Sequence, residues 1–154
     1  MTEDTQFPAP AFSLPSDTGE TVSLDGLKGQ PFVLFFYPRD NTPGCTTEAK
    51  GFSADQAAFE AAGVRVFGVS KDSLDSHAKF RTKQELTVPL LSDEHGSLCE
   101  DLGVWTGKKM YGKAFMGIER ATFLIDGAGQ VVRAWRKVKV PGHVEDVLAA
   151  VKAL

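Results

Sequence analysis

Residues 32–37 form a continuous apolar run that is rich in aromatic side chains and is bounded by Pro31 and Pro38. A short apolar run between two prolines predicts an internal strand of a sheet. Residues 64–70, with the sequence VRVFGVS, indicate a second strand. The segment between them has apolar residues at steps of three and four, which is the spacing of a helix. We therefore expect a strand, a helix and a second strand at the centre of the chain.

The central helix is expected to run from Pro43 to about Ala62. Thr42 has the side chain of an N-cap residue, Pro43 suits the first helical position, and Gly63 supplies a C-terminal stop. One face of this helix carries Cys45, Ala49, Phe52, Gln56 and Phe59. The sulfur of Cys45 is therefore expected at the top of the stripe that packs into the core. It should be sheltered there and reachable through a small opening.

The remaining pattern predicts further elements on both sides of this centre. Two short runs, residues 11–14 and 21–24, flank a turn and predict an N-terminal β-hairpin, followed by a helical turn at 25–28. Farther on we expect helices at 73–86, 95–102 and 143–154, strands at 88–91, 120–125 and 131–138, and a glycine- and lysine-rich loop at 106–117. This alternation predicts an α/β fold with a mixed central β-sheet flanked by helices on both faces.

Length and composition limit the class of protein. A chain of 154 residues is expected to form a single domain, residues 1–154. Its net charge of −3 argues against nucleic acid as a principal partner. No apolar run approaches the roughly 20 residues that a membrane span needs. The first residues are polar and acidic, unlike a secretory signal, so we expect a cytoplasmic protein.

Cys45 stands at the third position of the predicted helix, where backbone N–H groups are free. These groups and the positive end of the helix dipole favour a thiolate over a thiol. The alternative is that Cys45 is a small apolar filler, which is the usual role of a free cysteine. The preceding Thr42-Pro43-Gly44 sequence, the strand before it and the lack of apolar neighbours immediately after Cys45 favour a reactive sulfur.

The spacing Pro38-x-x-x-Thr42-x-x-Cys45 resembles the signature of the peroxiredoxins. The longer sequence TPGCTTE at residues 42–48 is similar to the branch of the bacterioferritin comigratory protein, also called PrxQ. The similarity covers nearly the whole chain and includes residues 117–126. It implies a thioredoxin-like fold and a thiol-dependent peroxidase that reduces hydrogen peroxide and organic hydroperoxides.

The chemistry of such a peroxidase suggests a role for each residue. A thiolate at Cys45 attacks the terminal oxygen of a hydroperoxide, and the sulfur becomes a sulfenic acid. The backbone N–H groups of Gly44 and Cys45, with the Thr42 hydroxyl, can stabilise the charge that develops on the oxygens. The resemblance implies that Arg120 supplies a cation, although its position alone equally suits a surface strand residue. Pro38 suits both a shield against solvent and the end of a strand.

Other kinds of site fit the sequence less well. A thioredoxin-type dithiol needs C-x-x-C, but Glu48 occupies the place of its second cysteine after Cys45. Glu48 suits either a hydrogen bond near the site or the favourable charge of a helix start. His77, His95 and His143 pair with no cysteine at ligand spacing, so we expect no metal or cofactor and interpret them as ordinary surface or helix residues. A redox sensor or chaperone-like binding protein is the alternative of a different class.

The second sulfur determines how the sulfenic acid is reduced. Many PrxQ-like proteins carry a second cysteine at the position of Lys50 or near that of Arg81, whereas this chain has only Cys99, on a later helix. We expect Cys99 to be a buried filler. The prediction is a one-cysteine mechanism in which an external thiol, such as thioredoxin or a glutaredoxin-like protein, reduces Cys45 in a monomer. A disulfide between Cys45 and Cys99 is the alternative.

Overall fold

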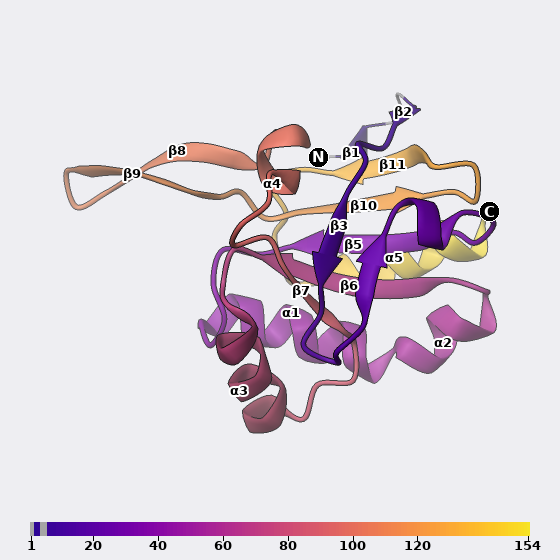
Figure 1. Ribbon diagram of the computed structural model, residues 1–154, viewed down its shortest axis with the longest axis horizontal. Helices are drawn as coiled ribbons and strands as arrows, with labels where there is room; N and C mark the ends of the chain where they lie inside the picture. The colour runs from indigo at the N-terminus through magenta and orange to yellow at the C-terminus, as the bar shows by residue number, and fades with distance from the viewer. Residues whose placement is uncertain (1, 4–5) are drawn as a thin grey trace.

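The structure is a computed structural model that describes residues 2–3 and 6–154. Its centre is a seven-stranded sheet of order β1-β11-β10-β5-β6-β7, in which β2 also pairs with β11 (Figure 1). The parallel strands are β5 (Phe32–Phe36), β6 (Arg65–Ser70) and β7 (Leu90–Ser92). The antiparallel part consists of β10 (Ala121–Ile125), β11 (Gln130–Trp135), β1 (Thr2–Glu3) and β2 (Phe7–Pro8).

Strand β5 lies inside the sheet and corresponds to the apolar run of the sequence. Phe36 pairs in antiparallel register with Ala121 of β10 and in parallel register with Val69 of β6. All the side chains of β5 are buried, because both faces of the sheet are covered. The mixed central sheet that the sequence predicts is therefore confirmed.

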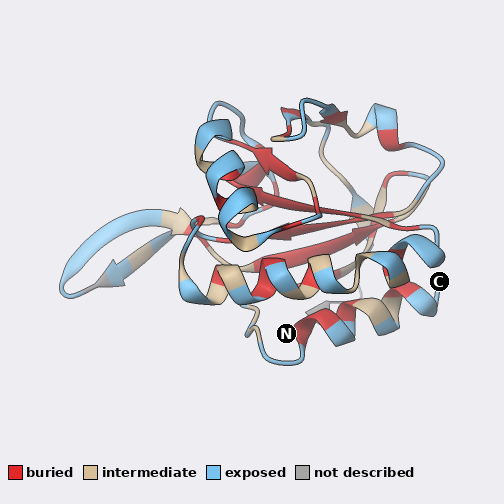
Figure 2. Ribbon diagram, turned by 90° about the horizontal axis from the view of Figure 1, so that it is seen from below, coloured by how far each residue is buried: buried red, intermediate tan, exposed pale blue. Residues whose placement is uncertain are grey.

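Two hydrophobic cores lie on the two faces of the sheet. Because successive side chains of a strand point to opposite faces, Val33 and Phe35 enter one core, while Phe32 and Leu34 enter the other. The first core is covered by α1 (Pro43–Ala54), α2 (Gln56–Ala61), α3 (Leu74–Gln84) and α5 (His143–Lys152). The second is covered by the hairpin of β3 (Ser13–Pro15) and β4 (Thr21–Ser23), the helical turn η1 (Asp25–Leu27) and α4 (Leu98–Asp101). Figure 2 shows the buried strands enclosed between these layers.

Two of the predicted helices differ from the structure. The helix expected over residues 43–62 is divided into α1 and α2 at Asp55, whose backbone has φ −97° and ψ 7°. Aspartate favours helix ends because its side chain competes for backbone groups. The helix expected over residues 95–102 is only α4, because the buried Asp93 carboxylate accepts the backbone N–H groups at its start. None of the described helices is long and apolar enough to span a membrane.

The prediction of a loop at residues 106–117 is wrong, because this segment forms a hairpin of two paired strands. Strands β8 (Trp105–Met110) and β9 (Lys113–Ile118) pair with each other and with no other strand of the described chain. Tyr111 and Gly112 at the turn have φ values of +52° and +76°, as a two-residue hairpin turn requires. Glycine and lysine are weak strand formers, so the composition concealed the pairing.

Candidate active site

Cys45 lies at the start of α1, directly after the central strand. The chain leaves β5 at Tyr37, turns at Asn41, whose φ is +63°, and begins the helix after Thr42. Cys45 is the third helical residue, and only 1% of it is exposed. It belongs to the same core as Tyr37 and Ala49. The sheltered position expected for the sulfur is therefore confirmed.

Thr42 is the N-cap residue through its backbone but not through its side chain. Its backbone is extended, and its carbonyl accepts the N–H of Thr46 at 2.9 Å. Its hydroxyl donates to the Arg39 carbonyl at 2.9 Å instead of capping the helix, so the predicted side-chain cap is wrong. The N–H groups of Gly44 and Cys45 thus lack this partner, and they face the space before the helix.

Arg120 connects the cysteine to a buried carboxylate. It lies between β9 and β10, and its Nη2 atom donates to Cys45 Sγ at 3.4 Å while Nη1 donates to Glu48 Oε1 at 2.6 Å. Partial burial works against the charge on Arg120, but Glu48 and Cys45 outweigh it and raise the pKa of the guanidinium. The structure thus brings a permanent cation to the sulfur from 75 positions away in the chain.

Glu48 is the site residue to which the sequence gave no definite role. Its side chain is fully buried, and its Oε2 atom has no hydrogen-bond partner among the described residues. Burial raises the pKa of Glu48 to about 7, although the neighbouring Arg120 acts in the opposite direction. The available signal was its spacing, because a residue three positions after Cys45 lies on the same side of a helix.

The three histidines have different surroundings. His95 is exposed, as expected, whereas His77 and His143 lie on helices but are buried and hydrogen-bonded. His143 Nε2 lies 2.7 Å from the Thr122 hydroxyl and 4.0 Å from Glu48 Oε2. Burial lowers the pKa of His143 to about 4, so its ring is neutral at pH 7. His143 therefore borders the buried carboxylate without adding charge.

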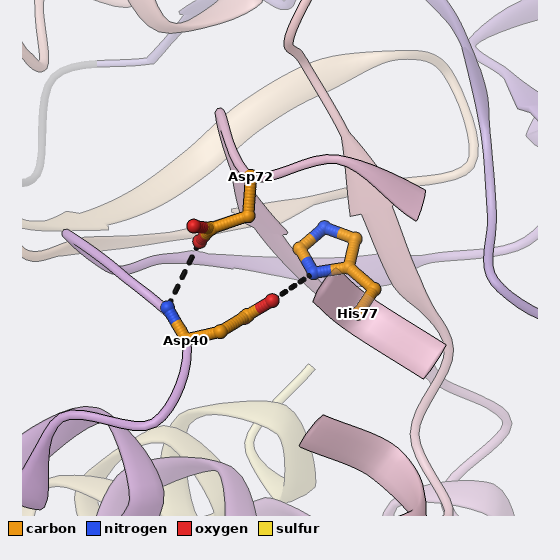
Figure 3. Close-up of side chains that lie close together, drawn as sticks. All are labelled: Asp40, Asp72 and His77. Carbon is orange, nitrogen blue, oxygen red and sulfur yellow. Dashed lines mark hydrogen bonds and ion pairs between the residues drawn. The ribbon is translucent and has the colours of Figure 1, made fainter. Parts of the chain in front are cut away.

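His77 connects the loop before α1 to the rest of the fold. Its Nδ1 atom lies 2.7 Å from Asp40 Oδ2, and its Nε2 atom lies 2.9 Å from the Leu91 carbonyl. Asp40 also accepts the Tyr37 hydroxyl at 2.7 Å and donates its backbone N–H to Asp72 at 2.9 Å. Figure 3 shows Asp40 between Asp72 and His77, in contact with both.

This group, in which Asp40 and His77 are buried and Asp72 is partly buried, has the composition of a metal site but is already hydrogen-bonded. The possible ligand atoms of Asp40, Asp72 and His77 lie within 4.8 Å of one another. Both ring nitrogens of His77 and both oxygens of Asp40 have protein partners. Burial disfavours a charge on His77, but the Asp40 carboxylate prevails and raises its pKa. We therefore interpret the cluster as a structural tie that fixes the approach to α1.

The sequence also singled out Pro38 and Cys99. Neither belongs to the hydrogen-bonded group of Cys45, Glu48 and Arg120. Pro38 is exposed just beyond β5. Cys99 is fully buried, as expected of a filler, and it lies in the core on the opposite face of the sheet from Cys45. Burial, with the neighbouring Asp93 carboxylate, raises the pKa of Cys99 far above its ordinary range. Its thiol is therefore protonated and unreactive.

Known proteins resemble this chain over almost its full length. The profile of the AhpC/TSA family matches residues 6–134. Peroxiredoxin Bcp of Bacillus subtilis is 48% identical over 144 residues, which cover 94% of this chain and 92% of that protein. Solved structures of Xanthomonas campestris peroxiredoxin Q and of the bacterioferritin comigratory protein of that organism each match with a TM-score of 0.87 and 48% identity, covering 92% of this chain and 90% of theirs. They confirm the thioredoxin-like fold. The chain therefore belongs to the AhpC/TSA family and is a peroxiredoxin of the PrxQ, or bacterioferritin comigratory protein, branch, a thiol-dependent peroxidase.

Proposed function

We propose that Cys45 is the peroxidatic residue and that Arg120 stabilises both its thiolate and the bound peroxide. The observation that carries this proposal is the guanidinium between Cys45 Sγ and the buried Glu48 carboxylate. The thiolate attacks the terminal peroxide oxygen, the O–O bond breaks, and the sulfur becomes a sulfenic acid. The leaving oxygen takes a proton and departs as water or an alcohol. Arg120 and the amides of Gly44 and Cys45 stabilise the charge that moves across the two oxygens.

Thr42 and Pro38 complete the proposed site. Because the Thr42 hydroxyl donates to the Arg39 carbonyl, its oxygen lone pairs remain available as acceptors. Thr42 therefore acts as an acceptor and not as the donor that the sequence suggested, and it can accept a hydrogen bond from the O–H group of a hydroperoxide and so direct the terminal oxygen toward Cys45. Pro38 is exposed just beyond β5 and has no backbone N–H to bind water, which is compatible with the proposed role as a shield against solvent.

A groove lined by the two residues that precede Cys45 supports organic hydroperoxides as substrates in addition to hydrogen peroxide. It lies between α1 and the start of α5, has a volume of about 670 Å³, and reaches Pro43 and Gly44 at the helix start. A Cβ atom at Gly44 would lie 3.1 Å from Arg120 Nη2, so the glycine keeps this end of the groove open next to the guanidinium. The bacterioferritin comigratory protein of Xanthomonas campestris has been studied for alkyl peroxide reduction, which supports the same substrate class here.

The position of the second sulfur supports a one-cysteine mechanism. Cys45 and Cys99 belong to cores on opposite faces of the sheet, whereas a disulfide needs Cα atoms within about 7 Å. Lys50 is exposed on α1, and Arg81 donates to two backbone carbonyls that follow α3, at 2.7 and 2.6 Å. Neither residue can resolve a sulfenic acid. We propose that thioredoxin or a glutaredoxin-like protein attacks the oxidised Cys45 and forms a mixed disulfide.

The state of the two cysteines bears on where the enzyme works. Both cysteines are free thiols, which suits a reducing compartment. We propose that the chain acts in the cytoplasm as a monomer. Cell fractionation tests the first statement, and sedimentation of the active enzyme tests the second.

Peptide mapping after one equivalent of peroxide tests the one-cysteine mechanism. A sulfenic-acid trap should label Cys45, while Cys99 remains a thiol. Cys45→Ser should lose all peroxide consumption and keep its fold, and Cys99→Ser should keep its turnover. A Cys45–Cys99 crosslink within one molecule, together with lost turnover in Cys99→Ser, would refute the mechanism.

The same variants distinguish an enzyme from a redox sensor. An enzyme consumes many equivalents of peroxide when a reducing thiol is present, whereas a sensor stops after one. Peroxide turnover that survives in Cys45→Ser would show that the reactive group lies elsewhere.

A further inference from the structure

The hairpin of β8 and β9, residues 105–118, is called the arm below. Only its base packs into the body, where Trp105 and Ile118 contact the hydrophobic core. Figures 1 and 2 show the rest of the arm projecting from the molecule, with most of its surface exposed. Tyr111 is 97% exposed, Phe115 45% and Met116 52%. A two-stranded hairpin is marginally stable by itself, so large apolar side chains at its outer part indicate a surface for a partner.

The arm also differs from the rest of the chain in charge. It carries Lys108, Lys109 and Lys113 and no acidic residue, whereas the whole chain has a net charge of −3. Lys108 is used at the base, where its Nζ atom donates to the Ile118 carbonyl at 2.5 Å. Lys109 and Lys113 are exposed and form no ion pair within the described part of the chain. The outer arm therefore offers positive charge and apolar area together, which fits an acidic protein surface.

The arm begins next to the reactive cysteine. Strand β9 ends at Ile118, two positions before Arg120, and Arg120 donates to Cys45 Sγ. In Figure 1 the arm leaves the body at the end of the molecule where α1 begins. A thiol-dependent peroxidase requires a reductant that reaches this end, and a nearly buried sulfur requires that the reductant be well oriented.

We propose that the arm docks the protein thiol that reduces Cys45, and that this partner has acidic and apolar side chains around its reactive cysteine. The inference rests on the proposed direct reduction of Cys45. The partner thiol attacks the sulfenic acid, an S–S bond forms and water leaves; a second thiol of the partner then attacks the mixed disulfide. Cys45 returns as a thiol and the partner leaves as a disulfide. Opposite charges on the arm and on the partner increase the rate of encounter and fix its orientation.

Charge reversal on the arm tests this proposal. The variant Lys109→Glu/Lys113→Glu is compared with the matched control Lys83→Glu/Lys152→Glu, which changes the net charge equally at exposed positions on α3 and α5. The measured quantity is the second-order rate constant for reduction of oxidised Cys45 by reduced thioredoxin, at low and at high ionic strength. The arm variant should be at least tenfold slower at low ionic strength and should lose its salt dependence. The control should match the native protein.

Two reactions separate docking from chemistry. Oxidation by hydrogen peroxide and reduction by dithiothreitol should proceed at native rates in the arm variant, because neither needs the arm. Phe115→Ser should lower the rate constant for reduction of Cys45 by thioredoxin without changing the salt dependence of that rate constant. If dithiothreitol no longer reduces Cys45 in Cys99→Ser, direct reduction itself fails and the arm proposal fails with it.

Two outcomes would overturn the role of the arm while leaving direct reduction intact. One is a native protein that reacts no faster with thioredoxin than with dithiothreitol, and the other is a native thioredoxin rate in the arm variant at low ionic strength. In the second case, binding to anionic vesicles and self-association in sedimentation are compared between the two proteins. Loss of vesicle binding in the arm variant would assign the arm to a lipid surface, and loss of self-association would assign it to a second copy of the chain.

Discussion

At the scale of single residues, the orientation of Arg120 determines how charge is distributed around the sulfur. One nitrogen of the guanidinium contacts Cys45 and another contacts Glu48, so the fork is held at two points. A lysine ammonium lacks this planar fork and cannot hold both contacts in one fixed geometry. The neutral His143 ring behind Glu48 leaves the carboxylate with Arg120 as its paired cation.

Arg120→Ala should slow the reaction of Cys45 with peroxide at least tenfold, which corresponds to about 1.4 kcal/mol of barrier. The reason is the loss of the charge that stabilises the thiolate and the transition state. Arg120→Lys should recover only part of the rate. Stopped-flow kinetics give the rate, and ultraviolet absorbance gives the thiolate fraction. Arg65→Ala, which removes an exposed pair with Glu20, is the control. An unchanged rate and thiolate fraction in Arg120→Ala would place the cation elsewhere.

Glu48→Gln should remove a pH dependence from the peroxide reaction. The pKa of Glu48 is raised to about 7, so below this pH the carboxylate gains a proton and Arg120 loses the anion that fixes it. The rate constant of the native protein should therefore fall as the pH decreases through about 7. In Glu48→Gln the side chain is neutral at every pH, so the rate should be lower and this step absent. A step of equal size near pH 7 in both proteins would contradict the assignment.

At the scale of elements, the start of α1 is fixed by a tie from α3. Tyr37 and Asp40 lie at the two ends of the turn that follows β5, and both belong to the hydrogen-bonded group around His77. His77 also reaches the Leu91 carbonyl of β7. The loop that positions Cys45 is thus connected to two neighbouring elements through fully buried side chains.

His77→Leu should lower the free energy of unfolding by about 3 kcal/mol, because it leaves the Asp40 carboxylate buried without its charged partner. The pKa of His77 is raised above 6.5, so its contribution is complete below that pH and is lost as the pH rises through the folded-state pKa. Urea denaturation below pH 6.5 and at alkaline pH measures both effects. The matched control is His95→Leu, at an exposed position. Equal losses in the two variants, or a loss that grows with pH, would contradict the tie.

At the scale of the whole molecule, the sheet separates two chemical environments. One face holds Cys45, Glu48 and Arg120, while the other holds Cys99 beside the Asp93 carboxylate. Strand β5 contributes side chains to both cores. A sulfenic acid formed on one face is therefore shielded by the sheet from the thiol on the other, and its reductant comes from outside.

Two buried groups make opposite contributions to stability between pH 4.5 and 6.5. The pKa of Glu48 is raised from 4.5 to about 7, so the folded state holds a proton that the unfolded state releases, and stability falls as the pH rises. The pKa of His143 is lowered from 6.5 to about 4, so the unfolded state holds the extra proton and stability rises with pH. In the native protein the two contributions should largely cancel.

Single substitutions should make each contribution visible. Relative to the native protein, Glu48→Gln should become more stable as the pH rises across this window, and His143→Gln should become less stable. Each variant loses a difference of up to one bound proton between the folded and unfolded states. The slope of its free energy of unfolding against pH should therefore differ from that of the native protein by up to about 1.4 kcal/mol per pH unit. Denaturant unfolding at several pH values measures these slopes. Relative slopes of the same sign in the two variants would show that one of the pKa shifts is assigned incorrectly.

The local features of the site could be predicted from the sequence because they depend on neighbours in the chain. The apolar run that forms β5, the turn after it and Pro43 at the first helical position place Cys45 at a helix start. The family signature names Arg120, but no local property of residue 120 indicates that it reaches a sulfur. The break at Asp55 and the hairpin at residues 105–118 were missed, because several local choices there are close in energy.

Tertiary structure alone decided which distant groups meet. Arg120 reaches Cys45 because β10 pairs with β5, which places the start of β10 beside the start of α1. The same packing buries Glu48 and His143 together, and burial then shifts both pKa values. The face on which Cys99 lies depends on how the chain crosses the sheet, since a cysteine on an apolar helix face can pack against either side. Pairing, burial and choice of face are properties of contacts between distant segments, so the pattern along the chain leaves them open.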